Sequence, residues 1–393
     1  MSTLSDLSDH AARSMHSAQM LPPSAYTTDE LLEAEHHTIF ANEWICVGRS
    51  IDVANRGDYL VGQIPGARPG EYRSVIVVRD DLDQIAVFDN VCVHRGSPLL
   101  SDCGNGARIT CPYHAWTFRL DGQLIGAPYM NRTSDELGHP FDPSAFRLST
   151  LRSELWQGFI FVTQDPAAVP LGSRLTGLTE IVSRYEMAHY VSVHQQVDVW
   201  ATNWKLLVEN FMDAYHIFKV HKNSFAKDGD NTLATEMFPG TDAWAHHRVV
   251  HRSEEGSGSA HPTNTSLQGD WRRTIVLAAV FPTHVMQLQP DWMWYLQISP
   301  IDTDHVRIRW DVSVAPEVLA AQSDQAGYIA GLLELVNLVN SEDQPIVEGV
   351  RRGVTNPGLQ RGPLSYLEQN VFDFDRYIAR RLSDPLVCGT VRQ

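Results

Sequence analysis

The sequence predicts an α+β protein, with an all-β domain first and then a domain in which helices pack against an antiparallel sheet. From Trp44 to Phe161, short runs rich in Val and Ile, such as SVIVV at 74–78, alternate with turn residues such as Asp121-Gly122. After residue 172, longer strand-like runs are followed by two helical patterns, an order that is typical of α+β domains.

Residues 1–40 have the pattern of a polar tail followed by a helix. The stretch TTDELLEAEHHTIFANEW, at 27–44, opens with a Thr-Thr-Asp helix start and then repeats apolar residues with helical spacing. We expect this N-terminal helix to pack on the second domain. The proline-rich stretch QDPAAVPLG, at 164–172, reads as a joint, so the predicted domains are residues 41–165 and 166–393.

The second domain is predicted to contain a helix at 203–219 and further helices near 316–353 and 365–382. Its expected strands are runs of β-branched and aromatic residues. They are WAHHRVVHR at 244–252, TIVLAAVF at 274–281, THVMQLQP at 283–290, WMWYLQI at 292–298 and HVRIRWDVSVA at 305–315. Antiparallel pairing of these strands, covered by the helices, would complete the domain.

Composition limits the class of partner. The 393 residues carry a formal charge of −16, which argues against nucleic acid or an anionic membrane as the main partner. The same charge is compatible with a cationic substrate or a cationic docking protein. No apolar run has the length of a membrane span, and the polar N-terminus lacks the apolar core of a signal peptide, so we expect a cytoplasmic protein.

The five cysteines are too few and too irregular for a disulfide framework. They are Cys46, Cys92, Cys103, Cys111 and Cys388. Two of them form part of Cys-x-His and Cys-x-x-His pairs, namely Cys92 with His94 and Cys111 with His114. Two thiolates and two imidazoles on converging loops suit a zinc ion, or a [2Fe–2S] cluster with cysteine on one iron and histidine on the other.

The surrounding residues favour the cluster. The pattern C-x-H-R-G-x-x-L followed by C-P-Y-H-x-W resembles the signature of the Rieske iron–sulfur family, and TFRLDGQL at 117–124 continues the match. The matching residues outside the ligand pairs are Asn90, Arg95, Gly96, Leu99, Pro112, Tyr113 and Trp116. The resemblance implies that Cys92 and Cys111 hold one iron while His94 and His114 hold the other. Cys103, Cys46 and Cys388 have no place in the motif and are expected to be structural.

A second set of candidate ligands lies in NWKLLVENFMDAYHIFKVH, at 203–221. Its apolar residues recur at helical spacing and predict one core-facing stripe. These residues are Trp204, Leu207, Phe211, Tyr215 and Phe218. Asp213 and His216 share a helix face, but His221 lies five residues beyond His216 and joins them only if the helix distorts or ends near 217. Two histidines and a carboxylate form the ligand set of non-haem Fe(II) oxygenases, which leaves positions open for O₂.

The pattern N-W-K-x3-E-N-x2-D-x2-H-x4-H resembles the catalytic signature of Rieske ring-hydroxylating oxygenase alpha subunits. The resemblance covers nearly the whole chain and implies a helix-grip (START-like) catalytic domain. It implies that His216 and His221 bind a mononuclear Fe(II). It also implies that Asp213 bridges His216 and the Rieske His114 of a neighbouring subunit, in a homotrimer. Asn210 matches the asparagine that the family places near the iron.

The resemblance places the third iron ligand in NSEDQPIVEGVRRG, at 340–353. Asp343 is the favoured residue, because the family ligand is usually the second acid of such a pair. Glu342 is adjacent but points about 100° away on a helix. Read alone, the two acids are equally compatible with a solvated helix face.

Electrons must come from elsewhere, because the chain has no flavin or nicotinamide fingerprint; GNGARI at 104–109 lacks the third glycine of a dinucleotide-binding loop. The resemblance therefore implies a separate NAD(P)H reductase, acting directly or through a ferredoxin. The reaction expected is hydroxylation or oxidative demethylation of a small organic substrate with O₂.

The substrate is less constrained. A dense set of aromatic, sulfur and amide side chains is expected to be mostly core. Its members are Met286, Gln287, Gln289, Trp292, Met293, Trp294 and Tyr295. Those that line a pocket would stack on an aromatic ring or surround a quaternary ammonium group. Many betaine-type relatives have Glu where Asp213 stands, a difference that favours the aromatic substrate over the choline or betaine alternative.

Two other classes of protein remain compatible with the sequence. An electron-transfer protein would have a cluster but no mononuclear iron, and a zinc-stabilised binding module would be colourless.

Overall fold

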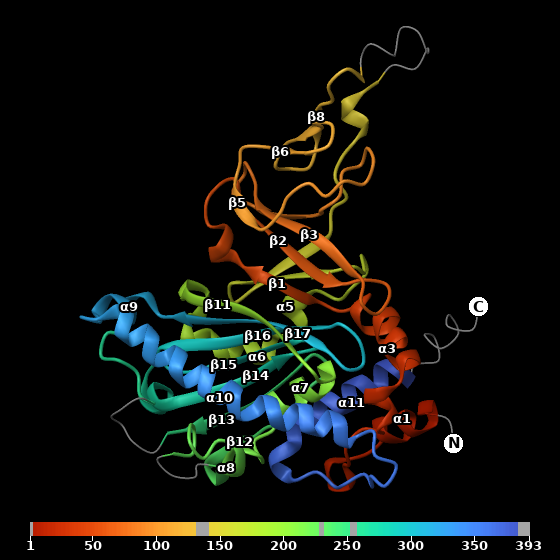
Figure 1. Ribbon diagram of the computed structural model, residues 1–393. Coiled ribbons are helices and arrows are strands. Elements are labelled where there is room, and N and C mark those ends of the chain that lie inside the picture. Colours follow the sequence, from red (N-terminus) through yellow and green to blue (C-terminus); the bar gives the residue numbers. More distant parts are fainter. Residues whose placement is uncertain (1–2, 131–140, 228–231, 252–257, 384–393) are drawn as a thin grey trace.

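The computed structural model describes residues 3–130, 141–227, 232–251 and 258–383. An N-terminal β region, from β1 to β10, stands on a larger C-terminal region that contains a seven-stranded sheet and the long helices (Figure 1). The combination of helices and antiparallel sheets confirms the predicted α+β class. Among the described helices, none has the length and apolar character needed to cross a membrane.

In the part that the structure describes, the N-terminal β region contains three small antiparallel sheets. In sheet order they are β1 (Ile45–Arg49), β10 (Phe159–Thr163) and β9 (Arg152–Trp156); then β4 (Ile85–Asp89), β3 (Tyr72–Arg79), β2 (Asp58–Pro65) and β5 (Cys103–Asn105); then β6 (Ile109–Thr110), β7 (Thr117–Phe118) and β8 (Leu124–Gly126). The predicted turn at Asp121-Gly122 lies between β7 and β8.

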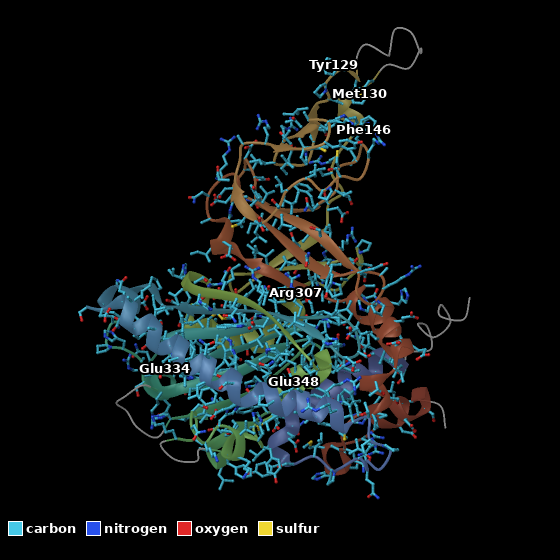
Figure 2. The ribbon with its side chains drawn as sticks, in the orientation of Figure 1. Tyr129, Met130, Phe146, Arg307, Glu334 and Glu348 are labelled. Carbon is cyan, nitrogen blue, oxygen red and sulfur yellow. The ribbon has the colours of Figure 1, made fainter. Side chains whose placement is uncertain are left out.

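Strand β3 explains why SVIVV is apolar without alternation. Its successive side chains point to opposite faces, and both faces are buried. Val75 and Val77 belong to the main hydrophobic core, whereas Ile76 and Val78 belong to a second core around the Cys-His loops. Tyr129 and Phe146 lie beyond this second core, at the end of the β region that is remote from α10 (Figure 2).

The described residues of the C-terminal region form one antiparallel sheet. Its order is β11 (Val191–Trp200), β17 (Val306–Val314), β16 (Trp292–Pro300), β15 (His284–Leu288), β14 (Thr274–Val280), β13 (Trp244–Val250) and β12 (Thr235–Met237). The five predicted strands correspond to β13 through β17, and the dense aromatic and sulfur residues of β15 and β16 are buried.

The long helices lie against this sheet. Helix α7 (Trp204–Met212) contacts β14 and β16, and it also contacts α10 (Gln325–Gly353) and α11 (Gln369–Ser383). The shorter helices precede or follow these elements. They are α1 (Thr3–Ala11), α2 (Ser24–Thr27), α3 (Asp29–Glu35), α5 (Leu171–Arg174), α6 (Thr176–Val182), α8 (Ile217–Val220) and α9 (Pro316–Ala321).

The N-terminal segment packs on the helices of the C-terminal region. Helix α1 lies against α11 (Figure 1). At the end of α3, Glu35 accepts hydrogen bonds from Trp204 Nε1 at 2.7 Å and from Lys205 Nζ at 2.6 Å. All three side chains are buried. The limits of residues 1–40, 41–165 and 166–393 as domains stay a prediction.

The prediction of one helix over 203–219 is wrong. Helix α7 ends at Met212, and a separate turn, α8, begins at Ile217. Trp204 and Leu207 face the core as expected, but Tyr215 and Phe218 are exposed, at 49% and 47%. The physical reason is at Asp213, whose carboxylate accepts the backbone N–H of Tyr215 at 2.5 Å and so replaces the next helical bond.

Candidate metal centres

The break after α7 turns two histidines toward α10. Asn203 caps the start of α7 by accepting the N–H of Lys205, and Asp213 ends it with an extended backbone. His216 and His221 then flank the single turn of α8. The sequence predicted that His221 joins His216 only if the helix ends near residue 217. The helix ends at Met212, five residues earlier, and the two histidines can therefore converge.

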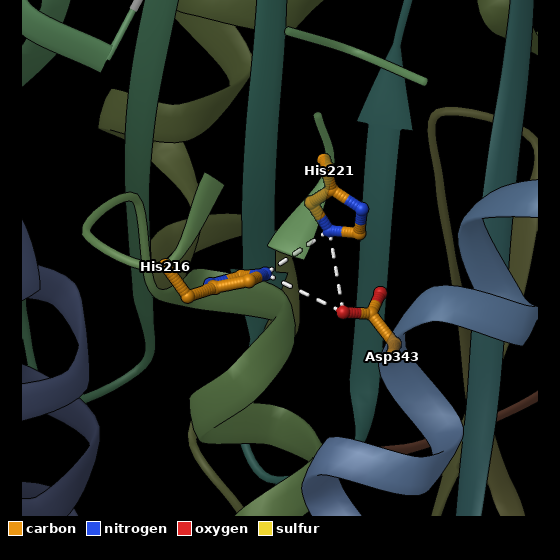
Figure 3. A group of neighbouring side chains, drawn as sticks. All are labelled: His216, His221 and Asp343. Carbon is orange, nitrogen blue, oxygen red and sulfur yellow. Dashed lines mark hydrogen bonds and ion pairs between the residues drawn. The ribbon is translucent and has the colours of Figure 1, made fainter. Parts of the chain in front are cut away.

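His216, His221 and Asp343 form one compact group of ligand atoms (Figure 3). His216 Nε2 lies 3.1 Å from His221 Nε2. Asp343 Oδ1 lies 3.4 Å from the first of these nitrogens and 3.2 Å from the second. His221 and Asp343 are buried. We refer to these three residues as the ligand triad.

The outer nitrogens of both rings face carboxylates. His216 Nδ1 lies 3.2 Å from Asp213 Oδ2, and His221 Nδ1 lies 3.0 Å from Glu342 Oε2. When each Nδ1 carries its proton, the two Nε2 atoms and Asp343 Oδ1 are electron-pair donors that face one another. Such a group needs a cation between its members, and its ligand types suit non-haem Fe(II).

The charges of the site lead to the same conclusion. Burial lowers the pKa of His216, but the Asp213 and Asp343 carboxylates outweigh burial and raise this pKa to about 10. Burial also raises the pKa of Asp343, but His216 and His221 reverse this and hold it far below its usual range. The carboxylates raise the pKa of His216 and the histidines lower the pKa of Asp343, so the site favours positive charge beside its carboxylates, and a divalent metal supplies such charge.

The structure brings Asp343, and not Glu342, into the triad. The two acids are consecutive on α10, so their side chains leave the helix about 100° apart. Asp343 faces the imine nitrogens, while Glu342 reaches the outer side of His221. The carbonyl oxygen of Asn210 accepts the N–H of Asp213 at 3.3 Å, so the predicted near-iron asparagine lies beside the helix end. The contact of Glu342 with His221 was not predicted from the sequence.

The other four predicted ligands lie on two loops with the same hydrogen-bond pattern. In each loop the N–H of the cysteine donates to the carbonyl of the fifth residue after it. The carbonyl of the cysteine accepts the N–H of the fourth residue after it. The four bonds are Cys92 N to Ser97 O at 2.8 Å, Gly96 N to Cys92 O at 2.9 Å, Cys111 N to Trp116 O at 2.8 Å and Ala115 N to Cys111 O at 3.0 Å. Gly96 and Ala115 occupy equivalent positions with φ of +76° and +55°.

These twin loops bring the side chains together. The rings of His94 and His114 have centroids 4.8 Å apart, and His94 stacks on Trp116 at 4.6 Å. Cys92 and Cys111 are buried. The Nδ1 atoms of both histidines are buried and have no hydrogen-bond partner among the described residues, so both are free to bind a metal.

The loop backbone also favours a thiolate at one cysteine. Burial raises the pKa of Cys111, but the N–H groups of Tyr113 and His114 outweigh it and lower this pKa overall. Burial is the main cause that raises the pKa of Cys92. Two cysteines and two histidines with free nitrogens fit a Rieske-type [2Fe–2S] cluster. Cys103 is exposed and Cys46 is buried, both outside this group; Cys388 lies outside the described residues.

Comparison with known families agrees with both sites. The family model described as ring hydroxylating alpha subunit (catalytic domain) matches residues 183–384, and the model of the Rieske [2Fe-2S] domain matches residues 43–144. The chain therefore belongs to the Rieske ring-hydroxylating oxygenase alpha-subunit family. It is the terminal oxygenase subunit of a non-haem iron oxygenase, an enzyme class whose cofactors are a [2Fe–2S] cluster and a mononuclear iron.

Two relatives are similar in sequence along most of the chain. The carnitine monooxygenase oxygenase subunit of Acinetobacter baumannii is 29% identical and aligns over 92% of this chain and 92% of its own length. The glycine betaine monooxygenase oxygenase subunit of Pseudomonas aeruginosa (strain UCBPP-PA14) is 27% identical over 95% of this chain and 91% of its own. Neither the zinc-stabilised module nor the electron-transfer protein is supported by these matches.

Solved structures show the same fold. The quaternary ammonium Rieske monooxygenase CntA, in complex with an inhibitor, has a TM-score of 0.78 at 24% identity, over 95% of this chain and 98% of its own. Naphthalene 1,2-dioxygenase from Rhodococcus sp. has a TM-score of 0.78 at 20% identity, over 97% and 98%. At these identities the likeness concerns the fold and does not select a substrate.

Proposed function

We propose that this chain oxidises a quaternary ammonium compound, with O₂ and with electrons from a separate reductase. The observation that carries the proposed chemistry is the ligand triad, with three electron-pair donors within 3.4 Å of one another and carboxylates behind both histidines. Cys92, His94, Cys111 and His114 would hold the cluster, and His216, His221 and Asp343 the mononuclear iron. The bound iron would supply the O₂ chemistry, and the cluster would supply electrons.

The substrate class rests on the relatives and on charge. Relatives that align along most of the chain are named for carnitine, glycine betaine and choline. They do not support the preference for an aromatic substrate that Asp213 gave, nor the role in aromatic hydrocarbon catabolism that such a substrate would imply. The formal charge of −16 also suits a cationic substrate.

Aromatic side chains lie between α7 and the sheet and beside His221. Phe211, on α7, has its ring 5.6 Å from that of Trp294 on β16, and Phe225 lies 5.3 Å from the ring of His221. Aromatic faces bind quaternary ammonium groups through cation–π attraction, and they also stack on aromatic rings. An aromatic substrate is therefore the second candidate.

The electron path is proposed to cross a subunit boundary in a homotrimer. Within one chain, β6, which precedes the second Cys-His loop, and α8, between the triad histidines, lie at opposite ends of the molecule (Figure 1). The exposed side chains of Tyr113 near one site, and of Tyr215 and Phe218 near the other, would lie at the contact between subunits. Light scattering of the purified protein tests for a trimer, and a monomer at working concentration would exclude this path.

The decisive test combines metal analysis with a substrate screen. His216→Ala should lower iron by about one per chain, leave acid-labile sulfide unchanged and abolish oxygenation. Substrate-dependent O₂ consumption, with NADH and a surrogate reductase, should be stimulated by carnitine, glycine betaine or choline more than by naphthalene. Near-normal turnover by His216→Ala would overturn the metal assignment, and stimulation by naphthalene alone would favour the second candidate.

A further inference from the structure

Glu342 has a position that the triad chemistry alone does not explain. Its side chain is 10% exposed and lies on the outer side of His221, away from the triad. Glu342 Oε2 lies 3.0 Å from His221 Nδ1 and 2.5 Å from Ser224 Oγ. One carboxylate oxygen therefore meets two polar atoms from the segment that follows α8.

The directions of these bonds determine the protonation of His221. The Ser224 hydroxyl donates to Glu342 Oε2, so this oxygen acts as an acceptor. The same oxygen presents its second lone pair to His221 Nδ1 at 3.0 Å, so this hydrogen bond forms when Nδ1 carries the proton and donates. The lone pair of His221 is then on Nε2, which faces Asp343 and His216.

We propose that Glu342 is a positioning residue for His221, with Ser224 holding the Glu342 carboxylate in place. This inference rests on the metal centre proposed above and goes beyond it. Glu342 selects the tautomer in which His221 Nε2 can bind a metal, and it fixes the plane of the ring. Consecutive residues of α10 thus have different tasks: Asp343 provides an oxygen to the metal, and Glu342 orients a histidine that provides a nitrogen.

The two histidines of the triad are supported from different elements. His216 has Asp213, three residues earlier in its own segment, at 3.2 Å. His221 has Glu342, which is distant in sequence and lies on α10. The spacing of the His-x4-His motif therefore does not show the second support; it depends on how α10 packs beside α8.

The test measures metal affinity and not turnover. The full chain, with its cluster retained and its mononuclear iron removed by chelation, is titrated with Co(II) in competition with a chromophoric chelator. Glu342→Leu, which cannot accept a hydrogen bond, should weaken Co(II) binding roughly 10–100-fold. Glu342→Gln, whose amide oxygen can still accept from Nδ1 and from Ser224, should weaken it less than about tenfold.

Two further variants complete the experiment. Ser224→Ala should have an effect between wild type and Glu342→Leu. Glu348→Leu is the matched control: Glu348 lies on the same helix (Figure 2) and bonds Gln344 Nε2 at 2.8 Å, away from the histidines. It should bind Co(II) within about twofold of wild type. The visible spectrum of the cluster reports whether each variant has folded.

The outcomes separate the two proposals. Wild-type Co(II) affinity in Glu342→Leu would overturn the positioning role, and so would equal weakening by the Gln and Leu variants, which would show that only the charge matters. A wild-type chain that takes up no Co(II), or one whose uptake is unaffected by His216→Ala, would instead contradict the proposed metal centre itself. If Glu342→Leu does not fold, Glu342→Gln and Ser224→Ala are compared instead, because both variants keep the packing of α10. Wild-type Co(II) affinity in Ser224→Ala would then overturn the proposal.

Discussion

At the scale of single residues, each triad histidine has its own carboxylate beside the ring nitrogen that faces away from the triad. Asp213 serves His216 and Glu342 serves His221. The sequence predicted the ligand types, the histidines and Asp343, because motif spacing records which residues are present. It did not predict Glu342, because that contact depends on the rotation of α10 about its axis.

Asp213 is predicted to act in electron transfer and not in metal retention. Asp213→Asn keeps the size of the side chain but removes the charge beside His216. We expect both metal centres to stay occupied and the reductase to reduce the cluster at the wild-type rate. Reoxidation of the cluster by O₂ with substrate present, followed by stopped-flow absorbance, should slow at least about tenfold.

The matched control for this variant is Asp242→Asn, which removes an exposed carboxylate that pairs with Arg380 and with no residue of the triad. It should behave as wild type. An Asp213→Asn protein that loses iron, yet reoxidises normally once iron is restored, would show that Asp213 is only a structural support.

A second residue-scale prediction concerns a pair of acids, Glu209 on α7 and Asp375 on α11. Burial raises the pKa of Glu209 to about 7, although the Tyr26 hydroxyl donates to it at 2.9 Å. Burial and the neighbouring Glu209 raise the pKa of Asp375 well above its usual value. Since folding raises the pKa of Glu209 above its unfolded value of 4.5, its contribution to stability is complete below pH 4.5 and is lost as pH rises through about 7.

Glu209→Gln removes this titration and should therefore gain stability relative to wild type between about pH 5 and pH 8, by roughly 1–3 kcal/mol. The apparent melting temperatures of Glu209→Gln and of wild type, each measured at pH 5 and at pH 8, give this gain in stability. The buried histidines are present in both proteins, so their contributions to the pH dependence cancel in the comparison. Glu334→Gln, at an exposed position on α10 (Figure 2), is the control and should show no such gain. The same pH dependence in Glu209→Gln and wild type would contradict the prediction.

At the scale of elements, α7 shows where sequence periodicity stops being sufficient. The helical spacing of Tyr215 and Phe218 is real, but Asp213 offers its carboxylate to the backbone and ends the helix first. Strand β11 was missed for a different reason. It is an edge strand that pairs only with β17, so most of its side chains are exposed or half-buried. Its sequence, VSVHQQVDVW, therefore lacks the apolar runs that marked β13 to β17.

The position of α7 depends on a buried ion pair with the N-terminal segment. Glu35→Leu should lower the free energy of unfolding by about 3–5 kcal/mol, because it leaves the Lys205 ammonium buried and unpaired. Tryptophan fluorescence during urea unfolding measures the change. The double variant Glu35→Leu/Lys205→Met should recover part of the loss, and not all of it, because Trp204 Nε1 stays without its acceptor. A double variant less stable than Glu35→Leu would contradict this account.

At the scale of the whole molecule, the sequence predicted two regions and their order, but not the contacts through which the two regions pack on each other. Arg49, on β1, is fully buried. Its guanidinium donates to the carbonyls of Tyr190 and Met187 and to Ser313 Oγ, which in turn donates to Asp311 Oδ1 at 2.5 Å. No motif marks these contacts, because their partners are mostly backbone carbonyls that become neighbours only after both sheets have formed.

Arg49→Met is predicted to uncouple the two regions. The substitution keeps a long apolar side chain but removes the donor to the Tyr190 carbonyl and to Ser313 Oγ, while the Met187 carbonyl keeps the N–H of Tyr190; each group left unpaired costs about 1–3 kcal/mol. In wild type, loss of cluster absorbance and the change in tryptophan fluorescence should coincide during thermal unfolding, as one cooperative transition. In Arg49→Met the cluster signal should be lost at a lower temperature than the fluorescence signal.

Arg79→Met is the control, because Arg79 donates to Val53 O and Asp83 O within the N-terminal β region. This variant should lower the temperature of the unfolding transition while the two signals still coincide. Coincident signals in Arg49→Met would mean that the apolar contact between the regions is sufficient to couple them without this arginine.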